Sequence, residues 1–212
     1  MTVGNGAAAS SDVVAPLIKI DTRQQAGKHK NIDQWLESNN IAYSYEKLDF
    51  GDYMRDGSNV SVDTKSGMDE LAMDLGRDHD RFVRECERAI HAGYRLVVLV
   101  EAGRKYNDQV EVEGWSGRGC RSCQTVCDPN DYSHKCSRPH RPMVGRKLWA
   151  TMQTMERRHA VRFAFCSKRE TARIICDLLG VKVRRKTRCQ MKNRAFRRAG
   201  GRHWNTSGVD GR

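Results

Sequence analysis

Short apolar runs alternate with helix-patterned segments along most of this chain. Runs with the length of strands occur at 17–22, 41–48, 94–100 and 161–165. Helical spacing of apolar residues marks 31–39, 68–75, 80–92, 146–157 and 167–179. The helix at 80–92 is expected to bury one face, which carries Phe82, Cys86, Ala89 and Ile90. Strands interleaved with helices predict an α/β domain, a central mixed sheet flanked by helices.

A tight hairpin is predicted inside this pattern, at the turn-forming run Asp56-Gly57-Ser58-Asn59. A loop of two or of four residues places Asp52 directly opposite Asp63, with both carboxylates on one sheet face, whereas a three-residue loop would break this register. Lys65 returns to the same face because strand side chains alternate. Cross-strand carboxylates about 5 Å apart repel each other, so the pair favours a divalent cation between them.

Two carboxylates and an amine beside a divalent cation are the groups that metal-assisted cleavage of a phosphodiester requires. The alternative is a polar hairpin on a solvated surface. In the first strand two isoleucines face one way and Asp21 the other, so Asp21 is expected to point away from the buried side. Arg81, Arg84 and Arg88 share a second face of the helix at 80–92, where they can contact a phosphate backbone or solvent.

Positive charge is concentrated towards the C-terminus. The 212 residues carry a net charge of +12, and residues 182–212 alone contain eleven Lys or Arg against one acid. Such a basic tail suits a phosphate backbone, with Phe196 and Trp204 able to stack on bases. A solvated tail or an address signal is the alternative. The candidate nucleic-acid-binding residues are Arg184, Arg185, Lys186, Arg188, Arg197 and Arg198.

Length and hydropathy limit the protein class. A chain of 212 residues holds one domain of ordinary size with tails or an insertion. The strongest apolar run, 96–100, is far shorter than the roughly 20 residues that cross a bilayer. Residues 1–15 lack the charged start and apolar core of a secretory signal. We therefore expect a disordered N-terminus at 1–15, a domain over 16–181 and an intracellular, cytoplasmic protein with no membrane partner.

Four cysteines cluster within an otherwise polar segment at 103–142. Their spacing is C-x₂-C-x₃-C-x₈-C, and a loop of this length cannot bury a core of its own, so four thiolates on Zn²⁺ would fold it. His134 is a possible substitute for one thiolate, and His140 a weaker one. Free thiols are one alternative; disulfides are disfavoured in a reducing compartment. The predicted ligands of this structural Zn²⁺ are Cys120, Cys123, Cys127 and Cys136.

Three motifs in order give the chain a family resemblance. They are Ile20-Asp21-Thr22-Arg23-Gln24, Gly51-Asp52-Tyr53, and the run from Val62-Asp63-Thr64-Lys65 to Asp69. Together they resemble the XPF-type nuclease domain of the restriction-endonuclease-like PD-(D/E)XK superfamily, in its compact phage and bacterial form. The resemblance covers about residues 17–180 apart from the cysteine-rich insertion. The chain departs from the family pattern at Gln24 and Asp63, where the family has Glu, and at Thr64, where it has Arg.

The resemblance implies a restriction-endonuclease-like fold and a role for each motif residue. Asp21, Asp52 and Asp63 would hold Mg²⁺ or Mn²⁺, and Lys65 would assist at the scissile phosphate. Arg23 and Asp69 would support them. Aspartate in place of glutamate keeps a hard oxygen ligand, so metal binding should survive. Loss of the arginine can alter DNA binding or the rate of cleavage.

The expected function is therefore metal-dependent DNA cleavage, with a preference for flapped, forked or branched DNA. The expected partners are DNA and either a second copy of the chain or a partner subunit. A catalytically inactive DNA-binding protein that uses the same cleft, zinc loop and tail is the main alternative. An RNA nuclease or a Holliday-junction resolvase would share the chemistry and differ in substrate.

Overall fold

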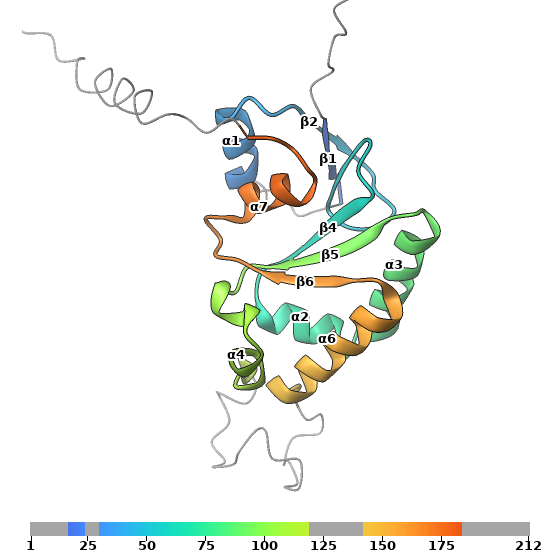
Figure 1. The fold of residues 1–212 in the computed structure, drawn as a ribbon, viewed down its shortest axis with the longest axis vertical. Helices are drawn as coiled ribbons and strands as arrows, with labels where there is room; N and C mark the ends of the chain where they lie inside the picture. The colour runs from blue at the N-terminus through green and yellow to red at the C-terminus, as the bar shows by residue number, and fades with distance from the viewer. Residues whose placement is uncertain (1–16, 24–29, 119–141, 184–212) are drawn as a thin grey trace, which may run out of the picture. The chain divides into compact units, whose positions relative to one another are not determined.

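The computed structural model describes residues 17–23, 30–118 and 142–183 (Figure 1). All of these except Val183 belong to one compact unit, 1–182. The predicted disordered N-terminus, the four clustered cysteines with His134 and His140, and the six candidate residues of the basic tail lie outside the described residues.

The described residues form one six-stranded sheet. It is mixed and flanked by helices, as the alternating pattern predicts. Its strands are β1 (Ile18–Asp21), β2 (Tyr43–Glu46), β3 (Tyr53–Arg55), β4 (Val60–Lys65), β5 (Arg95–Val100) and β6 (Arg162–Phe165). They lie in the order β2-β1-β3-β4-β5-β6. Strand β3 is antiparallel to both its neighbours, and the other pairs are parallel. Strands β4 and β5 are buried along almost their whole length, which is typical of a sheet covered on both faces.

Helices cover both faces of this sheet (Figure 1). One layer contains α1 (Lys30–Ser38) and α7 (Thr171–Leu178), which contact each other. The other layer contains α2 (Met68–Asp74), α3 (His79–His91) and α6 (Gly145–His159). The main apolar core lies between this second layer and the sheet, where Phe82, Leu148 and Val98 are fully buried. The carboxyl end of β4 lies near α2 and α3, which line a cavity with it.

Helix α3 confirms most of its predicted buried face and corrects one residue. Phe82, Cys86 and Ala89 are buried, whereas Ile90 is 42% exposed. Ile90 lies about 80° around the helix from Phe82, so it sits at the border of the buried stripe. The helix ends before Gly93, whose φ of +79° suits a glycine at a helix C-terminus.

Residues 104–118 fold as part of the domain, although they fall within the segment predicted as an insertion. They form a 3₁₀ helix, η1 (Arg104–Asn107), and a short helix, α4 (Gln109–Glu113), which the apolar pattern does not predict. Val112 and Trp115 are buried, and α4 contacts α6. A Cβ at Gly145 would lie 2.2 Å from the Val112 carbonyl oxygen, so only glycine permits this approach. Only 119–141 therefore remains for the predicted zinc loop.

No helix in the described parts of the chain is long and apolar enough to span a membrane.

Candidate active site

An open cavity of about 670 Å³ lies where β4 ends beside α2 and α3. We call it the carboxylate cavity. Seven acidic side chains line it: Asp21, Asp49, Asp52, Asp63, Glu70, Asp74 and Glu85. Four cationic side chains line it as well: Arg23, Lys65, Arg81 and Arg88. The acids outnumber the cations by three, so the cavity attracts positive charge.

The predicted hairpin has the predicted register, with a correction at its open end. Tyr53 pairs with Val62, as required for Asp52 to come opposite Asp63. However, β3 begins only at Tyr53, because Gly51 has a φ of +64° and turns the chain before Asp52. The Asp52 N–H donates to the Val62 carbonyl at 2.7 Å, one residue short of Asp63. Asp52 and Asp63 therefore share the cavity without forming a ladder pair.

Asp52 is held by the residue that follows Asp63. Its Oδ2 accepts hydrogen bonds from the Thr64 N–H, at 2.8 Å, and from the Thr64 hydroxyl. These two bonds fix the carboxylate against β4 on the cavity side. Thr64 thus orients Asp52.

Lys65 connects two buried carboxylates. Its Nζ lies 2.8 Å from Asp63 Oδ2 and 2.7 Å from Asp74 Oδ2. All three side chains are nearly inaccessible to solvent. Neither Oδ2 has a well-aligned hydrogen-bond donor among the described residues, so Lys65 is the cation that offsets the charge at these two oxygens. The other oxygen of Asp74 accepts from Arg81. The predicted alternation of Asp63 and Lys65 onto one face is confirmed.

Burial and neighbouring charge change the pKa of both groups. Burial raises the pKa of Asp63 to about 8; Lys65 opposes this shift, and the charges of Asp52 and Glu85 add to it. Burial lowers the pKa of Lys65, but the charges of Asp63 and Asp74 outweigh it, so the pKa lies above the ordinary value of a lysine. Lys65 therefore stays positively charged. A further cation beside Asp63 would favour the ionised form of that carboxyl.

Asp21 is buried rather than pointing away from the buried side as predicted. Arg23 Nε lies 3.2 and 3.0 Å from the two oxygens of the Asp21 carboxylate, and the Leu48 N–H donates to Asp21 Oδ1 at 3.1 Å. Only 6% of Asp21 is exposed, because these partners cover it. Asp21 still lines the carboxylate cavity, and the expected support of Asp21 by Arg23 is present.

Asp69 lies away from the carboxylate cavity, and Asp74 lines it instead. Asp69 accepts a hydrogen bond from the Arg118 N–H at 2.8 Å. Residues 69 and 74 are five positions apart, or about 140° around α2, so they face different sides of the helix. Only the packing of α2 decides which side meets Lys65.

Helix α3 supplies the other wall of the carboxylate cavity. Arg81, Glu85 and Arg88 lie on one face of the helix and line the cavity, whereas Arg84 does not. Glu85 Oε1 accepts a hydrogen bond from the Gly51 N–H at 3.0 Å, which ties the helix to the turn before Asp52. Sequence reasoning missed Glu85, although its spacing of four from Arg81 and three from Arg88 is the signal that would find it.

The carboxylate cavity offers the donor type that Mg²⁺ or Mn²⁺ binds. Asp21, Asp52 and Asp63 present hard oxygen ligands to one space, and its excess of acids favours a divalent cation. The three carboxylates are each engaged by protein groups, and no set of three or more acidic, His or Cys side chains in the described residues is gathered as a ready metal cluster. The donor type suits the ion, but the described side chains would have to turn towards one point to bind it.

No protein-family model matches the chain, and no curated protein matches it either.

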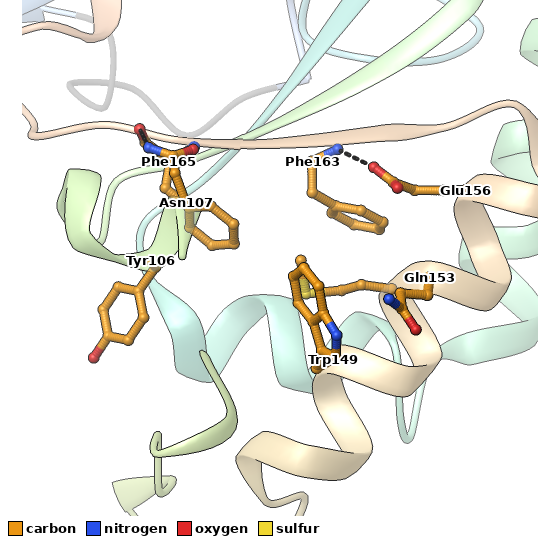
Figure 2. Close-up of a pocket in the computed structure, with 8 residues that line it drawn as sticks. Tyr106, Asn107, Trp149, Gln153, Glu156, Phe163 and Phe165 are labelled. Atoms are coloured by element: carbon orange, nitrogen blue, oxygen red, sulfur yellow. Dashed lines mark hydrogen bonds between the residues drawn. The ribbon is translucent and has the colours of Figure 1, made fainter. Parts of the chain in front are cut away.

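A second cavity, of about 100 Å³, lies between η1, α6 and the outer edge of β6 (Figure 2). Aromatic side chains dominate its lining: Tyr106, Trp149, Phe163 and Phe165. The Asn107 amide donates to the Phe165 carbonyl at 3.0 Å and accepts from its N–H at 3.1 Å. Glu156 accepts from the Phe163 N–H at 3.3 Å. Asn107 and Glu156 thus occupy outward backbone groups of β6 and hinder the addition of another strand.

Proposed function

We propose that this protein is a divalent-metal-dependent endonuclease of the XPF type that cleaves flapped, forked or branched DNA inside the cell. The observation that carries the proposal is the carboxylate cavity, where Asp21, Asp52, Asp63 and Lys65 meet from β1, the turn after residue 50, and β4. An acid-rich cavity with one buried ammonium suits metal-assisted attack on a phosphodiester, because it offers both ligands for the cation and a charge for the phosphate.

Each side chain has a defined part in this proposal. Asp52 and Asp63 would be the main ligands, with Asp21 as a further ligand or as the group that positions water. Mg²⁺ or Mn²⁺, when bound, supplies a Lewis acid that polarises the phosphate and lowers the pKa of water. Lys65 brings a permanent positive charge to the side of Asp63, where it can stabilise charge that develops on the phosphate.

The rim of the carboxylate cavity supports binding of the substrate backbone. Arg81 and Arg88 line the cavity, and the Arg81 side chain is 57% exposed. Exposed guanidinium groups beside an acidic centre favour a phosphate chain, because they offset repulsion between the acids and the nucleic acid. The basic tail would bind DNA in addition, and the four clustered cysteines would bind a structural Zn²⁺.

Cleavage of labelled flap, fork, four-way and linear duplex substrates with Mg²⁺ or Mn²⁺ tests the proposal. Cutting by the wild type should require the metal and disappear in Asp63→Ala. Asp78→Ala is the matched control, because Asp78 pairs with Arg77 and does not line the carboxylate cavity. Cutting that persists in Asp63→Ala would refute the site.

The same assay distinguishes the alternative functions. If the wild type binds branched DNA but neither it nor any variant cleaves it, the inactive DNA-binding protein is favoured. A parallel RNA panel separates a deoxyribonuclease from a ribonuclease. Metal analysis of the purified protein tests the zinc loop, for which about one zinc per chain is expected.

A further inference from the structure

We infer that Asp74 is a positioning residue that holds Lys65 and offsets its charge, so that Asp63 stays available to a divalent cation. The inference rests on the proposed function, because it assumes that Asp63 binds the metal. Asp74 lies outside the three motifs on which the family resemblance depends. Asp74 is the last residue of α2, and its carboxylate reaches the Lys65 ammonium.

The geometry makes Lys65 a bridge between two acids. Its Nζ is nearly equidistant from Asp63 Oδ2 and Asp74 Oδ2, at 2.8 and 2.7 Å. Asp74 is only 4% exposed, so bulk water hardly reaches this ion pair. Arg81 Nη2 donates to the other oxygen, Asp74 Oδ1, at 2.6 Å. This contact from α3 fixes the Asp74 carboxylate with Oδ2 towards Lys65.

The charge balance shows what Asp74 changes. A buried ammonium with Asp63 as its one acidic partner would neutralise that carboxylate and repel an arriving cation. With Asp74 present, the Lys65 charge is shared between two carboxylates, so Lys65 repels a cation that arrives at Asp63 less strongly. Arg81 adds a positive charge at the solvent side, where screening weakens its effect on Asp63.

Binding of Mn²⁺ in the absence of DNA tests this role without relying on catalysis. Titration calorimetry should show that Asp74→Asn binds Mn²⁺ about tenfold to a hundredfold more weakly than the wild type, the range for groups that orient or balance metal ligands. The double variant Asp74→Asn/Lys65→Met should recover much of the lost affinity, because the uncompensated ammonium is gone. Asp78→Asn is the matched control, and its affinity should equal that of the wild type.

Each outcome decides the inference. Unchanged Mn²⁺ affinity in Asp74→Asn would overturn it. Lost affinity that Lys65→Met does not restore would also overturn it, because a purely structural role predicts no recovery. A wild type that binds Mn²⁺ but cuts no nucleic acid would refute the proposed function while the variants still decide the role of Asp74. A wild type that binds no Mn²⁺ would refute both.

Discussion

At Gly51 the chain makes the turn that brings Asp52 to the carboxylate cavity. The residue has a φ of +64°, and a Cβ there would lie 2.2 Å from the Ser61 hydroxyl oxygen. Ser61 is itself fully buried, with its hydroxyl near the carbonyl oxygens of Phe50 and Tyr53. Left-handed backbone and lack of space thus both require glycine at this position.

Replacing Gly51 with alanine should cost more stability than the same change at Gly57. Gly57 also has a positive φ, +76°, but its Cβ would meet no atom within 4 Å. We expect Gly57→Ala to lose about 1 kcal/mol from backbone strain, and Gly51→Ala to lose about 3 kcal/mol from strain and the clash with Ser61. Urea unfolding measures both; equal losses would contradict the close approach.

The raised pKa of Asp63 predicts a pH-dependent stability in the metal-free protein. Because the folded-state pKa, about 8, lies above the ordinary value near 3.8, its stabilising contribution is complete below about pH 4 and is lost as the pH rises towards 8. The unfolding free energy of the wild type minus that of Asp63→Asn, measured in chelator, should therefore fall as the pH rises from about 4 to 8. A difference that does not vary with pH would show that Asp63 titrates normally.

Among the elements, β6 shows how side chains can complete a sheet edge. Its inner side pairs with β5, and its outer backbone groups at Phe163 and Phe165 bond to Glu156 and Asn107 (Figure 2). The Asn107 amide imitates a neighbouring strand, because it both donates to and accepts from Phe165. This arrangement depends on η1, which places Asn107 beside the strand.

Asn107→Ala should loosen this edge. Loss of two hydrogen bonds to a partly buried peptide group is expected to cost about 1–2 kcal/mol. Hydrogen exchange of the Phe165 amide should become faster. In Asn107→Asp, a carboxylate can still accept from that amide, so protection should be closer to the wild type. Equal exchange in all three proteins would contradict the role of Asn107.

For the whole molecule, the uneven charge divides the chain into a folded domain and a basic tail. The compact domain extends to Lys182, and Val181 near its end is buried. Residues 184–212 contain ten Lys or Arg and one acid, so most of the net charge of +12 belongs to this part of the chain.

Deleting residues 184–212 should weaken DNA binding and flatten its dependence on salt. Each lost phosphate contact is expected to reduce the slope of log affinity against log salt by about 0.9. Fluorescence anisotropy over a series of salt concentrations measures this slope, and thermal unfolding of the truncated protein checks that the domain remains folded. Unchanged affinity at every salt concentration would refute the tail as a DNA grip.

Local patterns were sufficient to predict the order of strands and helices, the hairpin register at Tyr53 and Val62, and the meeting of Asp63 with Lys65. These features depend on residues that are near one another in the sequence, where alternation and turn chemistry decide the outcome. The short helix α4 escaped prediction because five residues contain too little periodicity to distinguish a helix from a loop.

The sequence by itself determined the α/β layering and which side chains enter the carboxylate cavity from the hairpin. The tertiary structure decided that Asp74, and not Asp69, reaches Lys65, and that Glu85 reaches the turn at Gly51. The physical reason is that the rotation of α2 and α3 about their axes follows from burial of their apolar faces against the sheet. That burial depends on contacts between distant segments, which no local pattern records.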